Sequence, residues 1–366
     1  MTKKVLNIFN ELLPSGGETM LLSAQSVMQR RGIESHVLST GLKVGSYSED
    51  LARAGVAIHH IRFAKSFGFL ASLYQLLKHH SFDIVHIHTQ RAYFFHTLIA
   101  HAASTPRIIR TVHHIFPWSG LLRWKNILFR HACSKLMGCV FLSNSPAGLA
   151  NERRCYGIRN RLIPNWYNSD VYQARTVSEY NASRALLGIG DHEFVAVSLG
   201  GNSDYKNLDL VINTIAGLPD HSKLHYLQVG DEGPTNPLTK LLASHDNCAR
   251  VKLCGRVTDP LPYLKAADVF VMPSSIEGFG VAAAEAMAVG VPCILSDRPA
   301  LSDFKHVTDQ IDYIDCSGEA LQKALLRLEE MDFEQRWARG QCLAEAMPLN
   351  YGLGVGPEML ADLYEE

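Results

Sequence analysis

The stretch Glu277–Pro292, EGFGVAAAEAMAVGVP, joins a glycine turn to a helical segment built almost wholly of Ala, Val and Met. Within 281–289 the only polar residue is Glu285. A helix that is apolar on all sides is normally buried, and a lone carboxyl group on such a helix is costly unless a partner satisfies it. The stretch therefore predicts a buried helix that carries one paired or ligand-binding carboxyl group.

Around this stretch, short apolar runs alternate with helix-length segments along the whole chain. Examples are VLNIFN (5–10), FDIVHIHT (82–89), EFVAVSLGG (193–201) and DVFVMPS (268–274). Such alternation predicts βαβ units and parallel sheets. Because 366 residues are too many for one ordinary core, we expect two Rossmann-like α/β domains facing a central cleft at the carboxyl ends of their strands.

The charge of the chain changes sign near its middle. Residues 1–165 hold 20 Lys and Arg against 7 Asp and Glu, whereas residues 166–366 hold 15 against 29. The segment 159–173 carries Pro, Asn and this change, so we place the hinge there. A basic lobe favours an anionic partner such as a membrane surface or a phosphorylated substrate. Nucleic acid is disfavoured, because the sequence contains no recognisable nucleic-acid-binding module.

The remaining bulk features favour a cytoplasmic protein. No apolar run reaches the ~18–20 residues that span a bilayer, and the N-terminal residues lack the pattern of a signal peptide. The eight cysteines are scattered and none forms a C-x-x-C pair. This usage is typical of reduced cysteines in a cytosolic chain.

The turn EGFG predicts an anion site at the start of the apolar helix. A helix that begins near Gly280 directs the backbone N–H groups of residues 278–281 at whatever precedes it. Glu277 and Glu285 flank this cradle, and carboxylates accept hydrogen bonds from sugar hydroxyls. The alternative is that the glycines only turn the chain and that Glu285 bonds a neighbouring loop.

The longer stretch PSSIEGFGVAAAEAMAVGVPCILSD (273–297) resembles the signature of the family 4 retaining glycosyltransferases of the GT-B fold. These enzymes move a sugar from a nucleotide diphosphate donor to an acceptor. The stretches SGGETMLLSAQ (15–25), DIVHIHT (83–89) and LIPNWYN (162–168) fall in the order expected of the family. The resemblance implies a basic N-terminal acceptor domain (1–165, joined by a C-terminal helix at about 348–366 that crosses back) and an acidic donor domain (166–347).

The resemblance also implies roles for individual residues. Glu285 would bind the ribose hydroxyls of the donor, and Glu277 would hold hydroxyls of the transferred sugar. Lys206 would neutralise the diphosphate without a metal or other cofactor, at the place where charge develops as the glycosidic bond breaks. The residues implied as donor-binding are Gly16, Gly17, Asn202, Lys206, Gly278, Phe279, Gly280, Val281 and Glu285; those implied as catalytic are His113, Glu277 and Lys206.

One position departs from the family pattern. The family carries an Arg five residues before this Lys, whereas here the pair Gly200-Gly201 stands in its place. One phosphate-binding cation is therefore missing, and Asn202 is the nearest candidate to donate instead. The alternative for Lys206 is a solvated charge at a helix start.

Two features of the N-terminal half point to the reacting sugar. Gly16 and Gly17 form the turn that in this family approaches the donor phosphate and the acceptor. The turn is not G-x-G-x-x-G, which disfavours a dinucleotide-binding oxidoreductase. His113, with His114 second, matches a family histidine that lies near the reacting sugar; the alternatives are an ordinary turn and a packed histidine.

His86 and His88 alternate on one predicted strand, so both face the same side. No carboxylate or cysteine stands near them at the spacing of metal ligands. We therefore expect no metal site and assign both rings to the core or to the lining of the cleft.

The stretch LLRWKNILFRHACSK (121–135) interleaves apolar and basic residues. We assign Arg123, Trp124, Lys125 and Arg130 to a membrane or acceptor surface, because this pattern suits a helix lying on an anionic leaflet. The alternative is a helix packed on the sheet whose basic side chains extend to solvent.

Together these features favour a glycosyltransferase of cell-surface polysaccharide, lipopolysaccharide or glycolipid synthesis. A UDP-sugar is the favoured donor, and a saccharide or polyprenyl lipid-linked molecule is the favoured acceptor. We expect the protein in the cytoplasm, with peripheral contact to the anionic inner membrane. The alternatives are a nucleotide-sugar epimerase, a phosphorylase, or a nucleotide-sugar-binding protein without turnover.

Overall fold

The computed structural model describes residues 2–115, 118–231, 233, 235–245 and 248–366. The chain divides into two compact units. Unit 1 comprises Met1–Trp166 and Leu353–Glu366, and unit 2 comprises Tyr167–Gly352. Within the described residues, every helix is too short or too polar to cross a bilayer.

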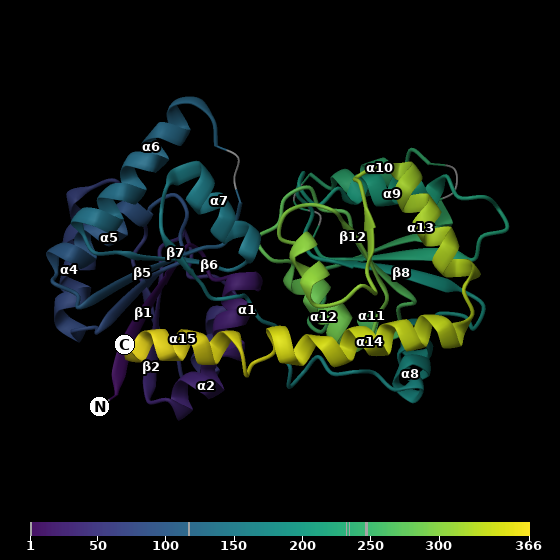
Figure 1. Ribbon diagram of the computed structural model, residues 1–366, viewed down its shortest axis with the longest axis horizontal. Helices are drawn as coiled ribbons and strands as arrows, with labels where there is room; N and C mark the ends of the chain where they lie inside the picture. Colours follow the sequence, from purple (N-terminus) through teal and green to yellow (C-terminus); the bar gives the residue numbers. More distant parts are fainter. Residues whose placement is uncertain (1, 116–117, 232, 234, 246–247) are drawn as a thin grey trace. The chain divides into compact units, whose positions relative to one another are not determined.

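Unit 1 is built on a parallel sheet that has seven strands in the described part of the chain (Figure 1). Its strand order is β3-β2-β1-β4-β5-β6-β7, so the order reverses between β1 and β4. Ligands of open α/β sheets bind at the carboxyl ends of strands next to such a reversal. The strands are β1 (Lys3–Phe9), β2 (Ile33–Ser39), β3 (Ala57–His60), β4 (Ile84–Ile87), β5 (Arg107–Val112), β6 (Val140–Ser143) and β7 (Asn160–Leu162).

Helices cover both faces of this sheet. One apolar cluster packs Phe69, Leu73 and Leu77 of α4 together with α5 residues against the sheet, and part of α6 packs on it. The opposite face is covered by α1, α2 and α15 (Figure 1). The helices of unit 1 are α1 (Gly16–Ser23), α2 (Gln25–Arg30), α3 (Ser48–Arg53), α4 (Phe67–His80), α5 (Tyr93–Ala102), α6 (Gly120–His131) with the π-helical turn η1 (Ala132–Leu136), α7 (Pro146–Tyr156) and α15 (Gly356–Glu365).

The C-terminal helix α15 is held on unit 1 by charge as well as by packing. The Arg31 guanidinium donates to Glu358, Asp362 and Glu365 at 2.6–2.8 Å. Each exposed pair contributes little alone, but one planar guanidinium that serves three carboxylates orders them together. Acidic residues of the chain end thus lie against basic residues of the first 165.

Unit 2 is built on a second parallel sheet, with strand order β10-β9-β8-β11-β12-β13 in the described residues. Here the order reverses between β8 and β11, which places the ends of these two strands at the expected ligand site. The prediction of two α/β domains, each built on a parallel sheet, is thus confirmed. The strands are β8 (Phe194–Leu199), β9 (Leu224–Val229), β10 (Val251–Gly255), β11 (Val269–Met272), β12 (Cys293–Ser296) and β13 (Asp312–Ile314).

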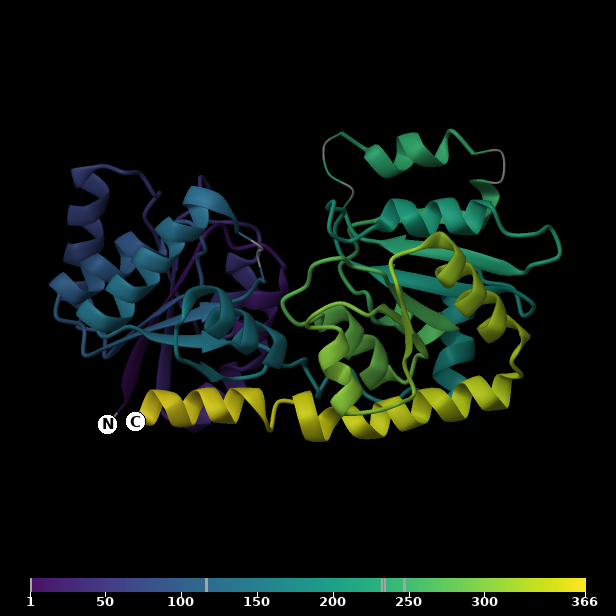
Figure 2. The same ribbon diagram turned by 45° about the horizontal axis from the view of Figure 1, so that its top comes forward.

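The helices of unit 2 form two layers (Figures 1 and 2). One face carries α9, α10 and α13, and the other carries α8, α11, α12 and α14. The bounds are α8 (Val177–Leu187), α9 (Leu208–Ala216), α10 (Pro237–Leu242), η2 (Cys248–Arg250), α11 (Leu261–Ala266), α12 (Val281–Val289), η3 (Ser302–His306), α13 (Gly318–Glu330) and α14 (Phe333–Tyr351).

Helix α12 is the apolar helix predicted from Glu277–Pro292. Ala283, Ala284 and Met287 are fully buried in the larger core cluster of unit 2. Gly290 ends the helix in the left-handed conformation, with φ of 84°, which only glycine adopts without cost. Burial of α12 thus fixes the loop that precedes it.

Candidate active site

The loop between β11 and α12 is locked in place by one glycine and one phenylalanine. Gly280 has φ of 96°, and a Cβ there would lie 2.6 Å from Leu301 Cδ2. Phe279 is buried and packs edge-on against Phe304 and Tyr351. Among the residues that the structure describes, no side chain caps the helix, so its first N–H groups are left for a ligand or solvent.

Glu285 lies one turn into α12 and is half-buried among fully buried neighbours. Burial raises the pKa of Glu285 to about 8, and a hydrogen bond from the Tyr172 side chain opposes that rise. The carboxyl group is therefore poorly solvated in the free protein. Its partner, Tyr172, comes from the end of the segment 159–173 that was predicted as the hinge, and nothing in the sequence pointed to this contact.

Lys206 and Glu277 form an ion pair at the carboxyl edge of the sheet in unit 2. Lys206 Nζ lies 2.6 Å from Glu277 Oε1, and the side chains are 25% and 13% exposed. Lys206 follows β8 and Glu277 follows β11, the two strands at the reversal of strand order. The fold thus brings together two residues that are 71 positions apart.

Two hydrogen bonds fasten the loops that carry this ion pair. Asn207 Nδ2 donates to the carbonyl oxygen of Pro273 at 2.8 Å. The backbone N–H of Ser275 donates to the carbonyl oxygen of Tyr205 at 2.8 Å. The loop that carries the cation is therefore fastened to the loop that carries the carboxylate before any ligand binds.

Glycines let the neighbouring strand ends approach one another closely. A Cβ on Gly230 would lie 2.1 Å from the carbonyl oxygen of Gly200, and a Cβ on Gly201 would lie 3.2 Å from that of Asp231. The N–H of Asn202 donates to the same Asp231 oxygen at 2.8 Å. A side chain at position 201 would therefore make a tight contact with the Asp231 carbonyl oxygen.

A cation does lie at this edge of the sheet, two strands away. Arg256 follows β10, and its Nη2 lies 3.3 Å from Asp231 Oδ2. Both side chains are more than half exposed, so the pair is weak and open to exchange with a ligand. Sequence reasoning did not single out Arg256, because the signature places its cations on the β8 loop.

In unit 1, Gly17 and His113 lie side by side. A Cβ on Gly17 would lie 3.2 Å from Phe9 Cε1 and 3.7 Å from His113 Cε1. Gly16 begins α1, and His113 directly follows β5. The turn and the histidine that the resemblance implied are therefore neighbours at the carboxyl edge of this sheet.

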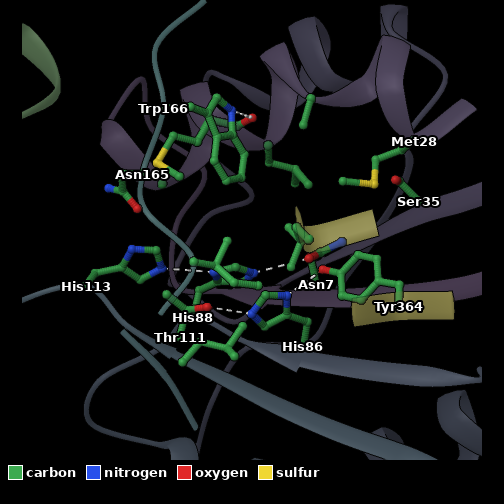
Figure 3. Close-up of a pocket in the computed structure, with 17 residues that line it drawn as sticks. Asn7, Met28, Ser35, His86, His88, Thr111, His113, Asn165, Trp166 and Tyr364 are labelled. Atoms are coloured by element: carbon green, nitrogen blue, oxygen red, sulfur yellow. Dashed lines mark hydrogen bonds between the residues drawn. The ribbon is translucent and has the colours of Figure 1, made fainter. Parts of the chain in front are cut away.

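Beside them, within unit 1, a cavity reaches under α1 and α2 (Figure 3). The cavity volume that the centres of water molecules can occupy is about 40 Å³. This is enough for two or three water molecules. Polar groups of Asn7, His86, His88 and His113 lie on one wall (Figure 3), and Trp166 donates from Nε1 to Met20 O at 3.2 Å on the other. His86 and His88 thus line a cavity, as expected of them.

Four poorly solvated histidines of unit 1, His86, His88, His96 and His113, have lowered pKa values and are neutral near pH 7. Burial is the first cause, and it lowers the pKa values of His86, His96 and His113 to about 3. The pKa of His88 is lowered well below its ordinary value by burial and by the charges of His86 and His113. Among the described residues no group of three or more metal-ligating side chains is close enough to hold a metal.

This burial makes the stability of the protein sensitive to acid. The unfolded chain binds protons at these histidines near pH 6.5, whereas the folded chain binds them only near pH 3. The free energy of unfolding should therefore fall as the pH drops below 6.5, by about 1.4 kcal/mol per pH unit for each histidine. Urea unfolding at pH 7 and pH 5 measures the slope.

A pair of variants checks the assignment of this slope. His96→Gln removes a fully buried imidazole and should flatten the slope, whereas His221→Gln removes an exposed one and should leave it unchanged. Equal stability at pH 7 and pH 5 in the wild-type chain would contradict the account.

Helix α6 presents an unusual surface. Leu121, Trp124 and Leu128 are 87%, 69% and 66% exposed and share one side of the helix. Arg123 and Lys125 are exposed beside them.

Arg130, however, is not on this surface, and its assignment there is wrong. It is 1% exposed and makes a bidentate ion pair with Glu152, at 2.7 and 3.0 Å. Its guanidinium also lies 3.9 Å from the centre of the Tyr156 ring. Arg130 therefore holds α6 on α7 instead of facing a ligand.

Comparison with known proteins supplies independent information. The model of the family "Glycosyltransferase Family 4" matches residues 14–171, and that of "Glycosyl transferases group 1" matches residues 180–339. The chain is 27% identical to an Escherichia coli UDP-Gal:alpha-D-GlcNAc-diphosphoundecaprenol alpha-1,3-galactosyltransferase, over 69% of this chain and 68% of that protein. It is 24% identical to the putative glycosyltransferase EpsF of Bacillus subtilis, over 85% and 81%.

Solved structures agree on the fold. Anabaena Alr3699/HepE, in complex with UDP-glucose, superposes with a TM-score of 0.84 over 99% of both chains at 18% identity. WaaG, a glycosyltransferase involved in lipopolysaccharide biosynthesis, superposes with a TM-score of 0.77 over 98% of this chain and 99% of its own at 16% identity.

Proposed function

The chain belongs to the family 4 glycosyltransferases of the GT-B fold, and from this premise we propose that it transfers a sugar from a UDP-sugar to a lipid-linked saccharide with retention of configuration. The observation that carries the proposal is the arrangement in unit 2. An ion pair of Lys206 and Glu277 stands beside the uncapped start of a buried helix that carries Glu285.

Each part of this arrangement suits one part of a nucleotide sugar. The N–H groups of Gly278, Phe279, Gly280 and Val281 would hold the diphosphate, because a helix start attracts anions. Glu285, poorly solvated in the free protein, would exchange its weak hydration for two ribose hydroxyls. Glu277 would accept hydrogen bonds from the sugar that is transferred.

Lys206 would act mainly in the transition state. When the glycosidic bond breaks, negative charge builds on the leaving diphosphate, and a cation already held there by the backbone needs no reorganisation. In the free protein this cation is balanced by Glu277. Asn202, at the adjoining strand end, would add a neutral donor where the family has Arg. We propose that the leaving diphosphate itself takes the proton of the acceptor hydroxyl, so no cofactor or metal is required.

Unit 1 would supply the acceptor side, with Gly16 and Gly17 leaving room for the substrate and His113 contacting a sugar hydroxyl. The choice of UDP draws support from the Anabaena complex with UDP-glucose and from the E. coli UDP-Gal transferase. The choice of a diphosphoundecaprenol-linked acceptor draws support from that same E. coli relative.

Transfer itself is tested with radiolabelled UDP-glucose, UDP-galactose and UDP-N-acetylglucosamine and a GlcNAc-diphosphoundecaprenol acceptor, in EDTA. We expect label from one of them in the lipid fraction, with the anomeric configuration of the donor retained in the product. UDP binding without transfer of any sugar to this acceptor or to water would contradict the proposal. It would favour instead a nucleotide-sugar-binding protein without turnover, which the missing Arg at position 201 left open.

We further propose that α6 docks unit 1 on the cytoplasmic face of an anionic membrane, where a lipid-linked acceptor resides. Support comes from the exposed apolar side formed by Leu121, Trp124 and Leu128, flanked by Arg123 and Lys125. Such a helix lies in the headgroup region with its apolar side buried.

Trp124→Ala should weaken binding to phosphatidylcholine–phosphatidylglycerol vesicles by about 10-fold, because one large apolar side chain no longer leaves water. Cosedimentation measures the effect. Leu186→Ala is the matched control, since Leu186 is 73% exposed on α8 of unit 2. Equal binding of all three proteins, or no binding by the wild type, would contradict the docking of α6.

A further inference from the structure

A row of hydrogen bonds crosses four neighbouring strands of unit 1 and ends at His113. His113 Nε2 lies 2.9 Å from His88 Nδ1, and His88 Nε2 lies 3.1 Å from Asn7 Oδ1. Asn7 Nδ2 then lies 3.4 Å from the carbonyl oxygen of His36. These residues follow or belong to β5, β4, β1 and β2, which are adjacent in the sheet, and Figure 3 shows the first two links.

The carbonyl oxygen of His36, at the end of the row opposite His113, determines which atom donates in each hydrogen bond. A backbone carbonyl can only accept, so Asn7 must turn its NH₂ group to His36 and its oxygen to His88. That oxygen can only accept, so His88 carries its proton on Nε2. Because a neutral imidazole has one donor and one acceptor nitrogen, His88 Nδ1 must accept from His113.

The rings packed around His88 keep this order in place. Phe9 stacks on the ring with 4.2 Å between centroids, and the tilted ring of His86 lies 4.1 Å away on the same measure. Desolvation disfavours the charged form of both His88 and His113. A protonated His88 would donate from Nδ1 and thereby require His113 to accept at Nε2, which reverses this hydrogen bond.

We propose that His88 and Asn7 are positioning residues that hold His113 as a neutral imidazole protonated on Nε2, so that Nδ1 is presented as a hydrogen-bond acceptor to a substrate hydroxyl. This rests on the proposed function of the chain as a sugar transferase. The other nitrogen of His113 is turned away from His88 (Figure 3). It suits a hydroxyl group, which can donate, and it gives no hydrogen bond to a phosphate oxygen or a carbonyl.

His86 provides the comparison within the same wall. It lies between Tyr364 Oη at 2.5 Å and Thr111 Oγ1 at 2.7 Å. Hydroxyl groups both donate and accept, so these partners allow either neutral form of His86. A histidine in this wall of the cavity is therefore not restricted to one neutral form by its location alone; the restriction of His88 comes from its partners.

Ring ¹⁵N spectra of the histidine-labelled protein test the inference without any substrate. Signals are assigned by their loss in His113→Gln and His88→Asn. We expect the protonated ring nitrogen of His113 to be Nε2, and we expect His88→Leu to change this form or make it heterogeneous. His88→Asn, whose amide oxygen takes the place of Nδ1, should preserve it. A wild-type His113 protonated on Nδ1, or a spectrum unchanged by His88→Leu, would overturn the inference.

A double-mutant cycle tests the link to catalysis. Its readout is consumption of whichever of UDP-glucose, UDP-galactose and UDP-N-acetylglucosamine the wild-type chain uses. His88→Leu should lower kcat/KM by about 2- to 12-fold, the range of one hydrogen bond, and should have no further effect when His113 is already alanine. His101→Gln, which replaces an exposed histidine of α5, is the control and should change kcat/KM by less than about twofold in either background.

The outcomes separate the two claims. An equal loss from His88→Leu with and without His113, in proteins of equal Tm, would overturn the positioning role and indicate a merely structural one. Failure to consume any of the three UDP-sugars would contradict the proposed function, whereas the ring spectra decide the protonation state of His113 by themselves.

Discussion

Replacing Glu285 by alanine should weaken UDP binding by about 100-fold, because two hydrogen bonds to the buried carboxyl group, each worth up to about 1.5 kcal/mol, are lost together. Isothermal titration calorimetry on the wild type and the variant measures the difference. Glu285→Gln should fall between them, since the amide keeps one acceptor in the same place.

The free variant should show the opposite trend in stability. Burial raises the pKa of Glu285 to about 8, so the folded chain keeps a proton that the unfolded chain releases above about pH 4.5. Glu285 therefore costs stability progressively as the pH rises from 4.5 to 8, and Glu285→Ala should remove that cost. A variant that binds UDP normally, or that loses binding only because it unfolds, would contradict the ribose role.

Replacing Lys206 by alanine should lower kcat by about 10²- to 10³-fold, the typical loss when one preorganised group that stabilises transition-state charge is removed. UDP affinity should fall less than kcat, because the charge on the diphosphate grows as the bond breaks. Steady-state kinetics with the UDP-sugar that the chain consumes measures both.

Lys265→Ala is the matched control. Lys265 is 20% exposed and pairs with Glu179 at 2.5 Å, much as Lys206 is 25% exposed and pairs with Glu277 at 2.6 Å, but it lies on α11. It should leave kcat unchanged within about twofold, as surface ion pairs contribute little. Similar losses from both variants would mean that Lys206 acts through stability and not through charge on the leaving group.

The part of the candidate site in unit 2 was predictable because its residues are encoded locally. Gly280, Glu277 and Glu285 stand within nine positions, where a glycine turn and an apolar helix leave little freedom. The approach of Lys206 follows from topology, since both loops leave adjacent strands at their carboxyl ends. The roles of these residues stay predictions until ligand binding is measured.

Contacts between distant segments were not predictable in this way. Tyr172, which contacts Glu285, lies in the segment predicted as the hinge, 113 positions before it in the sequence. The contact of His88 with Asn7 can be foreseen only once the strand order is known. Arg130 was misassigned for the same reason. An amphipathic pattern cannot show that the Arg130 guanidinium is buried in an ion pair with Glu152, 22 residues later.

Two short edge strands also escaped prediction. β7 (Asn160–Leu162) lies inside the segment that we assigned to the hinge, and β13 (Asp312–Ile314) is equally short. Three residues are too few to show an apolar run, and pairing with the preceding strand of the sheet, not local preference, makes them strands.

The most direct test of the account is thermal unfolding of the wild-type chain with UDP, GDP or ADP, in EDTA. The account predicts that UDP alone raises Tm strongly, since a ligand at about 100 times its Kd stabilises the folded state by about 2.7 kcal/mol. A Tm unchanged by all three nucleotides would contradict a nucleotide-diphosphate site on unit 2, and an equal rise with each would contradict its selectivity for UDP.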